Sequence, residues 1–219
     1  MFKPTNNEIV WQHVKIARTN LFNYISSLDA WQWDQPSLCQ GWRVRDVVAH
    51  MTILYKYPAK TAAIDLARSG FKLNGFLYKT AIQQGQQDYQ RLLKNYQEMI
   101  GHKNIPFFVP AFNALVDTLV HEQDIRIPLD HQKQIPAEVL QIIFKHWEPK
   151  RYNIGEKITG IKKRTKGLKF ITTDMDLTFG QGLVVTGSAQ DILLILTGRK
   201  PALNNLHGEG VNILRQRMH

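Results

Sequence analysis

The sequence predicts a mainly α-helical protein in two parts, a helical bundle over residues 1–150 and a small α+β module over residues 151–219. Two observations support this division. Through most of the first part, apolar residues recur at three- and four-residue steps, as they do on the buried faces of helices. After residue 150, glycine becomes frequent and short β-branched runs replace the long helical patterns. Four or five helices with short connections favour an up-and-down bundle.

The first part contains four long helical patterns. They cover residues 7–28, 44 to about 58, 74–100 and 111–127. We expect Pro58 to kink the second helix, because proline removes a hydrogen bond inside a helix. An ordered, tryptophan-rich loop over 29–43 joins the first two helices. Pro136 opens a further helix at a first-turn position, where its missing N–H costs nothing.

The second part combines strands with short helices. Residues 167–173 and 183–186 read as short strands separated by a glycine-rich turn. Ser188 is a suitable N-cap for a helix that ends at Gly198. A final helix is expected over 210–217. These elements predict a small α+β module after the bundle.

Composition excludes several classes of protein. A hydrophobic content of 43% is too high for a disordered chain. The single cysteine excludes a disulfide framework and a cysteine-rich zinc finger, and it fits a reducing compartment. No apolar run reaches the roughly 18–20 residues that cross a bilayer, and the first residues do not resemble a secretory signal. We therefore expect a cytoplasmic protein that does not span a membrane.

The formal net charge of +10 indicates a preference for anionic ligands. The surplus of basic residues is 4 over residues 1–150 and 6 over the shorter segment 151–219, with the densest run at 162–166. No recognition helix, RNA-binding signature or interleaved aromatic residues accompany this run. The charge therefore favours a small anionic substrate over nucleic acid.

Three residues on two expected helices have the spacing of metal ligands. Asp117 and His121 are four residues apart, so their side chains emerge from one helix face about one turn apart. His50 can supply a third ligand from the second helix. Two histidines and one carboxylate with an open position are typical of catalytic zinc and non-haem iron sites. Asp124, one turn further along, can orient His121.

The sequence also allows a solvated helix face in place of the metal site, and a nucleophilic cysteine or serine elsewhere in the chain. On a helical wheel, Asp117, His121 and Asp124 lie opposite the apolar stripe, so periodicity alone predicts a solvated face. Cys39 is a weak candidate nucleophile, since a catalytic thiolate needs a nearby base or a helix N-terminus. Ser37 and Ser188 sit in no nucleophile-elbow context.

Three blocks of sequence resemble a known family. Residues 36–51, PSLCQGWRVRDVVAHM, and residues 120–129, VHEQDIRIPL, resemble blocks of the mycothiol-dependent maleylpyruvate isomerase-like proteins, members of the DinB-like metalloenzyme superfamily. A third match covers 173–187, 196–202 and 208–211. The blocks occur in the family's order and cover both predicted parts of the chain.

The resemblance implies a DinB-like four-helix bundle followed by a small sterol-carrier-like module. It implies a divalent metal, with zinc, nickel or iron as candidates, held by His50, Asp117 and His121. Asp117 stands where the isomerase has glutamate, one methylene longer. The shorter side chain predicts weaker metal binding or a preference for another ion.

The resemblance also implies chemistry that depends on a low-molecular-weight thiol, either isomerisation or S-transfer on a small, electrophilic, anionic substrate. Arg199 and Arg126 are the candidate residues for binding a substrate carboxylate through bidentate contacts. The alternative is a non-catalytic ligand-binding or regulatory protein on the same fold, without metal. The sequence names neither the substrate nor the thiol, and it leaves the oligomeric state open, including a homodimer.

Overall fold

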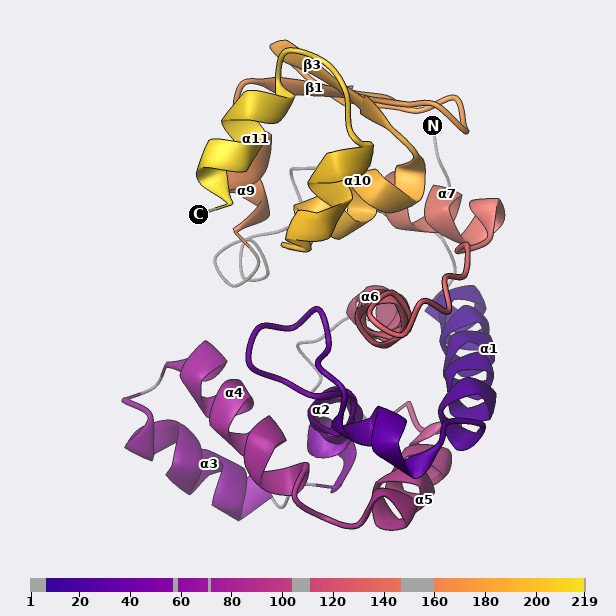
Figure 1. Cartoon of the computed structure of the whole chain (residues 1–219), viewed down its shortest axis with the longest axis vertical. Helices are drawn as coiled ribbons and strands as arrows, with labels where there is room; N and C mark the ends of the chain where they lie inside the picture. Colours follow the sequence, from indigo (N-terminus) through magenta and orange to yellow (C-terminus); the bar gives the residue numbers. More distant parts are fainter. Residues whose placement is uncertain (1–6, 57–58, 71, 104–110, 147–159, 219) are drawn as a thin grey trace. The chain divides into compact units, whose positions relative to one another are not determined.

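The computed structural model describes residues 7–56, 59–70, 72–103, 111–146 and 160–218. The chain forms two compact units, residues 1–133 and 134–219 (Figure 1). The predicted boundary near residue 150 lies outside the described residues, and the two units divide earlier, so the helix that follows Pro136 belongs to the second unit. No helix among the described residues is both long and apolar enough to cross a membrane.

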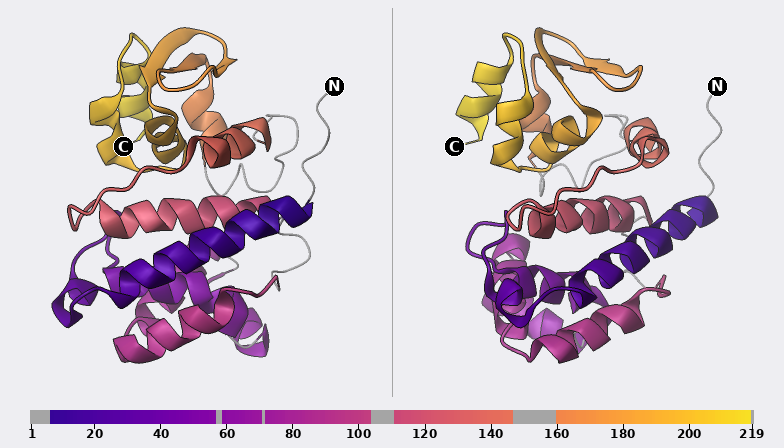
Figure 2. Two further views of the ribbon diagram at one scale, coloured as in Figure 1. Left: turned by 90° about the vertical axis from the view of Figure 1, so that its right-hand side faces the viewer. Right: turned by 45° about the vertical axis from the view of Figure 1, so that its right-hand side comes forward.

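The regular elements of the first unit, in its described residues, are all helices. Its elements are α1 (Asn7–Ser26), η1 (Ala30–Asp34), α2 (Val44–Lys56), α3 (Ala59–Arg68), α4 (Leu73–Gln84), α5 (Tyr89–Met99) and α6 (Ala111–Arg126). Helix α1 runs beside α6 and also packs on α5, and α2 packs on α4, α5 and α6 (Figure 2). The predicted mainly α fold class with a helical bundle is therefore confirmed.

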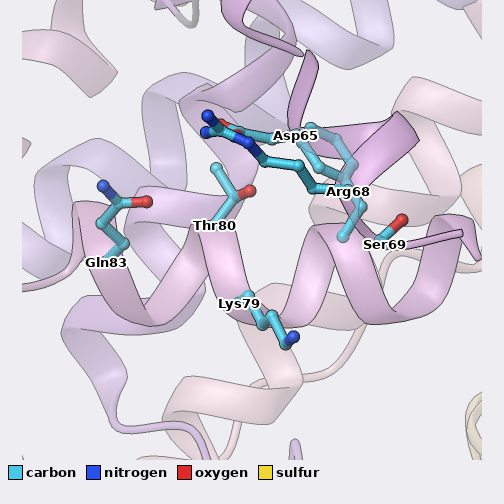
Figure 3. A pocket seen from close by; sticks show the side chains of 7 residues that line it. Asp65, Arg68, Ser69, Lys79, Thr80 and Gln83 are labelled. Atoms are coloured by element: carbon cyan, nitrogen blue, oxygen red, sulfur yellow. The ribbon is translucent and has the colours of Figure 1, made fainter. Parts of the chain in front are cut away.

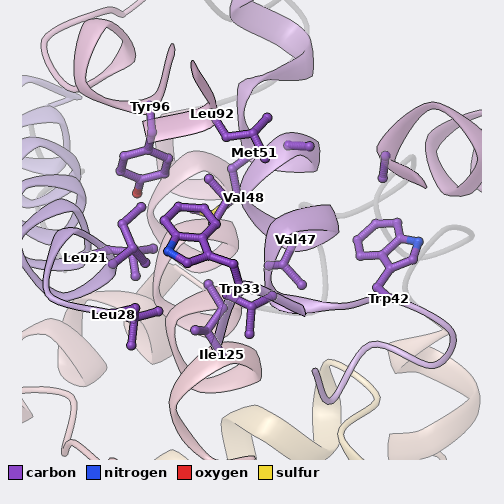
Figure 4. Close-up of a cluster of buried hydrophobic side chains, with 14 of the residues drawn as sticks. Leu21, Leu28, Trp33, Trp42, Val47, Val48, Met51, Leu92, Tyr96 and Ile125 are labelled. Carbon is purple, nitrogen blue, oxygen red and sulfur yellow. The ribbon is translucent and has the colours of Figure 1, made fainter. Parts of the chain in front are cut away.

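Trp33 lies at the centre of the bundle core and is fully buried. Leu21 of α1, Val48 of α2 and Ile125 of α6 surround its indole ring (Figure 4). Tyr89, at the start of α5, lies 5.4 Å from it between ring centroids. The tryptophan-rich loop is thus an ordered part of the core, as its composition predicts, and it joins α1, α2, α5 and α6.

The prediction of one long helix over 74–100 is wrong, because two helices, α4 and α5, occupy this segment. Asp88 ends the interruption by capping α5, since its side chain accepts a hydrogen bond of 2.8 Å from the backbone N–H of Gln90. Gly85 lies so close to α2 that a Cβ there would collide with the carboxylate of Asp46. The apolar pattern stops over residues 83–88, QQGQQD, which is where the two helices separate. Pro58, the predicted kink, lies outside the described residues.

The second unit combines short helices with a small sheet, as predicted, but the sheet has three strands and not two. Its elements are α7 (Ala137–His146), α9 (Ile161–Thr165), β1 (Leu168–Thr172), β2 (Thr178–Gly180), β3 (Leu183–Gly187), α10 (Ala189–Leu196), η2 (Lys200–Asn205) and α11 (Val211–Arg217). The strand order is β2-β1-β3, with β1 antiparallel to β2 and parallel to β3. Strand β2 was not predicted.

Gly180 and Gly182 let the chain pass from β2 to the other side of β1 in a very short connection. Gly182 has a φ of 122°, and a Cβ there would collide with the carbonyl of Gly167, which accepts a hydrogen bond of 3.1 Å from the N–H of Leu183. Only glycine accommodates this conformation and this close approach. The glycine-rich turn in the sequence therefore marks a strand crossover.

Candidate metal centre

The structure brings the three predicted metal ligands together inside the first unit. The Nε2 atom of His50 lies 4.0 Å from Oδ1 of Asp117, and Nε2 of His121 lies 3.5 Å from the same oxygen. The two imidazole rings are 5.0 Å apart between centroids. One ligand atom from each residue lies within 4.8 Å of the other two.

Packing of α2 against α6 explains why these side chains meet. Val47, Val48 and Ala49 of α2 are buried in the core. They place the adjacent His50 at the edge of the interface with α6. On α6, Asp117 and His121 are one turn apart and form an ion pair along the helix. The four-residue spacing therefore has the geometric consequence that the sequence predicted.

Asp124 holds the far side of the His121 ring. Its Oδ2 atom accepts a hydrogen bond of 2.8 Å from Nδ1 of His121, and its side chain is fully buried. A carboxylate at this position keeps the proton on Nδ1 and directs the lone pair of Nε2 towards His50 and Asp117. Metal-binding histidines are commonly oriented in this way.

The electrostatic surroundings favour the protonated form of His121 when no metal is bound. Burial lowers the pKa of His121, but the negative charge of Asp117 opposes this effect. Hydrogen bonds to Asp117, Asp124 and Cys39 act in the same direction as that charge. The net result is a pKa well above the ordinary value of 6.5, so a metal ion must displace a proton from this ring.

The helical-wheel interpretation of α6 is wrong for two of its three polar residues. His121 is 7% exposed and Asp124 is 0% exposed, whereas Asp117 remains 48% exposed at its side chain. The loop before α2 covers this part of α6, since the N–H of Leu38 donates a hydrogen bond of 3.0 Å to the carbonyl of Asp124. The ligand atoms are thus held in a buried face that opens at Asp117.

Cys39 belongs to the same cluster, although sequence reasoning treated it only as a weak candidate nucleophile. Its Sγ atom donates to Oδ2 of Asp124 at 3.1 Å and lies 3.8 Å from Nδ1 of His121. Ser37 fixes the loop locally, because its Oγ accepts from the N–H of Cys39 and donates to the carbonyl of Trp42. The family-like block over residues 36–51, which contains both Cys39 and His50, was the one signal in the sequence that Cys39 lies near the metal ligands.

An aromatic wall closes one side of the cluster. The indole ring of Trp42 lies 5.0 Å from the ring of His50 and 6.4 Å from that of His121. Tyr78 of α4 stacks on the indole at 6.2 Å. Gly41 has a φ of 78°, and a Cβ there would collide with the hydroxyl of Tyr78. These rings exclude water from one side of the imidazole pair.

The two predicted arginines have other contacts. Nε of Arg126 donates to Oε1 of the buried Glu122 at 2.8 Å, and its guanidinium group lies 3.6 Å from the ring centroid of Tyr24. Arg199 lies in the second unit, where Nη1 donates to the carbonyl of Thr197 at 2.6 Å. A carboxylate-binding role for either arginine stays a prediction.

A separate pocket lies between α3 and α4 (Figure 3). Its volume is about 240 Å³, and its lining includes the cations Arg68 and Lys79, the hydroxyl of Thr80 and the amide of Gln83. Arg68 is already paired with Asp65 at 3.2 Å. None of the predicted metal ligands lines this pocket.

The donor atoms in the cluster suit a divalent metal. Two imidazole nitrogens and one carboxylate oxygen match the preferences of zinc, and iron and nickel also accept such sets. The ion pair distances of 3.5 and 4.0 Å are close to the roughly 3.4 Å that separates ligands around tetrahedral zinc, if zinc–ligand bonds are about 2.1 Å. Small side-chain shifts would bring all three atoms within bonding distance of one ion.

Comparisons with known proteins agree with the resemblance seen in the sequence. Residues 14–73 match the family model of the mycothiol maleylpyruvate isomerase N-terminal domain. A crystal structure of a histidine-to-alanine mutant of the mycothiol-dependent maleylpyruvate isomerase is similar to this chain, with a TM-score of 0.61 at 12% sequence identity. A crystal structure of the mycothiol-dependent maleylpyruvate isomerase has a TM-score of 0.56 at 13% identity. Each match covers 93% of this chain and 93% of the other.

No curated protein matches the chain. At such low identity, the similar structures establish the fold alone. The family model spans residues 14–73, which include the block from Pro36 to Met51 and His50 itself. The predicted resemblance to the mycothiol-dependent maleylpyruvate isomerase family is therefore confirmed, through the N-terminal domain model for residues 14–73 and through the fold for nearly the whole chain.

Proposed function

We propose that this protein is a metal-dependent enzyme that uses a low-molecular-weight thiol for isomerase or S-transferase chemistry. The observation that carries the proposal is the convergence of His50, Asp117 and His121 on one point at the interface of α2 and α6. The similarity to maleylpyruvate isomerases supports the same assignment.

Each residue of the cluster has a distinct role in this proposal. His50 and His121 offer Nε2 lone pairs, and Asp117 offers a carboxylate oxygen and negative charge. Asp124 holds the proton on Nδ1 of His121, so that Nε2 stays unprotonated when the metal is present. Trp42 shields one side of the imidazoles from water. A divalent ion held here supplies positive charge that stabilises a thiolate and so lowers the pKa of a thiol.

The half-exposed carboxylate of Asp117 marks the side from which the thiol and the substrate approach. The thiolate sulfur bonds to one carbon of a double bond conjugated to a carbonyl group, and the π electron pair moves onto the carbonyl oxygen as an enolate. Rotation about the resulting single bond, followed by return of the electron pair and expulsion of the thiolate, gives the isomer. Transfer of the thiol's proton to the second carbon instead gives a stable thioether, the S-transfer product. The formal net charge of +10 suits a substrate with a carboxylate.

Elemental analysis of the purified full-length protein tests the proposal. We expect about one divalent ion per chain, because three protein ligands converge on one position. His50→Ala and His121→Ala should lose the ion, whereas His13→Ala, on α1, should retain it. If the wild-type protein neither contains nor takes up zinc, nickel or iron, the proposal is overturned.

A non-catalytic binding protein on the same fold remains the second candidate. The observation that favours it is the shorter carboxylate, because Asp117 stands 4.0 Å from His50 where a glutamate would reach further. This candidate predicts ligand binding without turnover of electrophilic, unsaturated acids in the presence of thiols. Turnover that depends on both the metal and an added thiol would exclude it.

A further inference from the structure

The imidazole ring of His121 has a second set of metal-binding atoms on the edge opposite His50 and Asp117. Sγ of Cys39, Nδ1 of His121 and Oδ2 of Asp124 lie within 4.8 Å of one another. The individual separations are 3.1 Å from sulfur to oxygen, 3.8 Å from sulfur to nitrogen and 2.8 Å from nitrogen to oxygen. Ligand atoms around a tetrahedral zinc ion are about 3.4–3.6 Å apart, so shifts of well under 1 Å would complete the site.

The second set is held more firmly than the first. Asp124 is fully buried, and the loop that carries Cys39 is attached to α6 by the hydrogen bond from the N–H of Leu38 to the carbonyl of Asp124. Ser37 adds a local turn around the cysteine. Cys39 has intermediate burial and therefore lies nearer the surface than Asp124.

The ligand types of the two sets predict different metal preferences. The first set has two nitrogens and one oxygen, which suit zinc, iron and nickel. The second set includes a sulfur atom, which soft ions bind most strongly as thiolate. Binding there would release the thiol proton of Cys39, and the carboxylate of Asp124 would become a ligand instead of a hydrogen-bond acceptor.

The two sets compete for one ring, because a neutral imidazole offers a single nitrogen lone pair. When Nε2 binds a metal, the proton resides on Nδ1 and is held by Asp124 at 2.8 Å. When Nδ1 binds a metal, the proton resides on Nε2 and faces Asp117 at 3.5 Å. Each edge of the ring therefore faces a carboxylate. Asp124 can hold the proton when the metal binds Nε2, and Asp117 can hold it when the metal binds Nδ1.

We propose that Cys39, His121 and Asp124 form a second metal site, selective for thiophilic ions, which excludes a metal from the His50–Asp117–His121 set when it is occupied. The competition rests on the proposed function of the first set, whereas binding at the second set does not. A thiophilic ion would thus inhibit the enzyme by withdrawing one ligand from its catalytic metal, without occupying the position of that metal.

A cadmium titration of the metal-free, full-length protein tests the second set. Cadmium bound to a thiolate gives a near-ultraviolet charge-transfer absorption, and Cys39 is the one cysteine of the chain, so any such band reports on it. We expect the band to saturate at about one ion per chain. Cys39→Ser should abolish the band, and His121→Ala should weaken cadmium binding by at least about 100-fold, more than loss of a group that merely orients a ligand.

His50→Ala separates the two sets, because His50 belongs only to the first. This variant should keep the cadmium band while it loses zinc. In the wild type, cadmium should release bound zinc in equal amount, as measured with a zinc-sensitive dye. Circular dichroism of Cys39→Ser and Cys39→Ala checks that each variant folds.

Three results would overturn the inference. The first is the absence of a thiolate band in the wild type, and the second is a band of equal affinity in His121→Ala, which would mean that Cys39 binds cadmium alone. The third is simultaneous binding of one zinc and one cadmium, which would contradict the competition. Failure of the proposed function would instead appear as loss of zinc binding in a protein that still gives the cadmium band.

Discussion

Helices α5 and α6 of the first unit bury their side chains in opposite ways. Helix α5 buries one apolar stripe, Leu92, Tyr96 and Met99, and leaves the rest of its surface accessible. Helix α6 is buried on almost all sides, including its polar residues His121, Glu122, Gln123 and Asp124. One helix therefore only supports the fold, whereas the other also carries the candidate site.

The difference shows what buried polar residues require. A charged group away from water is costly unless it is paired and hydrogen-bonded. On α6, Glu122 pairs with Arg126 at 2.8 Å and Lys133 at 3.2 Å, and Asp124 accepts from His121 and Cys39. On α5, the exposed Glu98 pairs with Lys56 at the surface. The charges of α6 are thus fixed in position, which is what a metal site needs.

The largest expected effect is on stability and comes from α5. Leu92→Ala removes a fully buried side chain and should lower the free energy of unfolding by about 2–5 kcal/mol, through lost burial and the cavity that remains. Gln97→Ala, at an exposed position of the same helix, should change it by less than about 0.5 kcal/mol. Urea denaturation measures both. Equal effects would mean that α5 does not bury one stripe.

Asp124→Asn should weaken zinc binding by about 10–100-fold while the protein still folds, because the carboxylate that orients His121 is lost. Isothermal titration of the metal-free protein with zinc measures the affinity. Asp130→Asn, at an exposed position just after α6, is the control and should bind zinc as the wild type does. An unchanged affinity in Asp124→Asn would remove Asp124 from the site.

The two paired glutamates give a direct comparison of the helices. Glu122→Gln on α6 should lower the free energy of unfolding by about 1–2 kcal/mol, since two cations lose a buried charged partner. Glu98→Gln on α5 should have no measurable effect, because exposed ion pairs contribute little. Chemical denaturation of the two variants in parallel tests this. The reverse order would contradict the account of α6.

The smallest expected effect is a pH dependence of the metal-free protein. The pKa of His121 in the folded state lies above 6.5, since its negatively charged and hydrogen-bonding neighbours outweigh burial, which lowers it. Its positive charge therefore stabilises the fold fully below pH 6.5, and this contribution is lost as pH rises through the folded value. The stability difference between wild type and His121→Gln, measured with a chelator present, should shrink as pH increases. A difference that grows with pH would contradict this prediction.

Much of the fold follows from sequence periodicity, because amphipathic helices such as α1 and α2 show their buried face directly. The break between α4 and α5 was not predicted in this way. The close approach of Gly85 to Asp46 is a tertiary contact, which a helical wheel does not contain. The helical wheel also predicted that His121 and Asp124 face solvent, because a wheel does not include the loop before α2 that covers them.

The metal ligands themselves could be proposed from spacing, since a four-residue step fixes Asp117 and His121 on one face of α6. The contribution of Cys39 could not, because it comes from a loop whose position depends on its hydrogen bonds to Asp124 and Ser37. Sequence patterns describe regular elements well. Contacts between a loop and a helix require the folded chain.

X-ray absorption spectroscopy of the zinc-loaded, full-length protein tests the central claim most directly. The ligand set His50, Asp117 and His121 predicts a first shell of nitrogen and oxygen atoms with two imidazole ligands and no sulfur. His50→Ala should lose the zinc signal. A sulfur ligand to zinc in the wild type, or a shell without imidazole, would contradict the account.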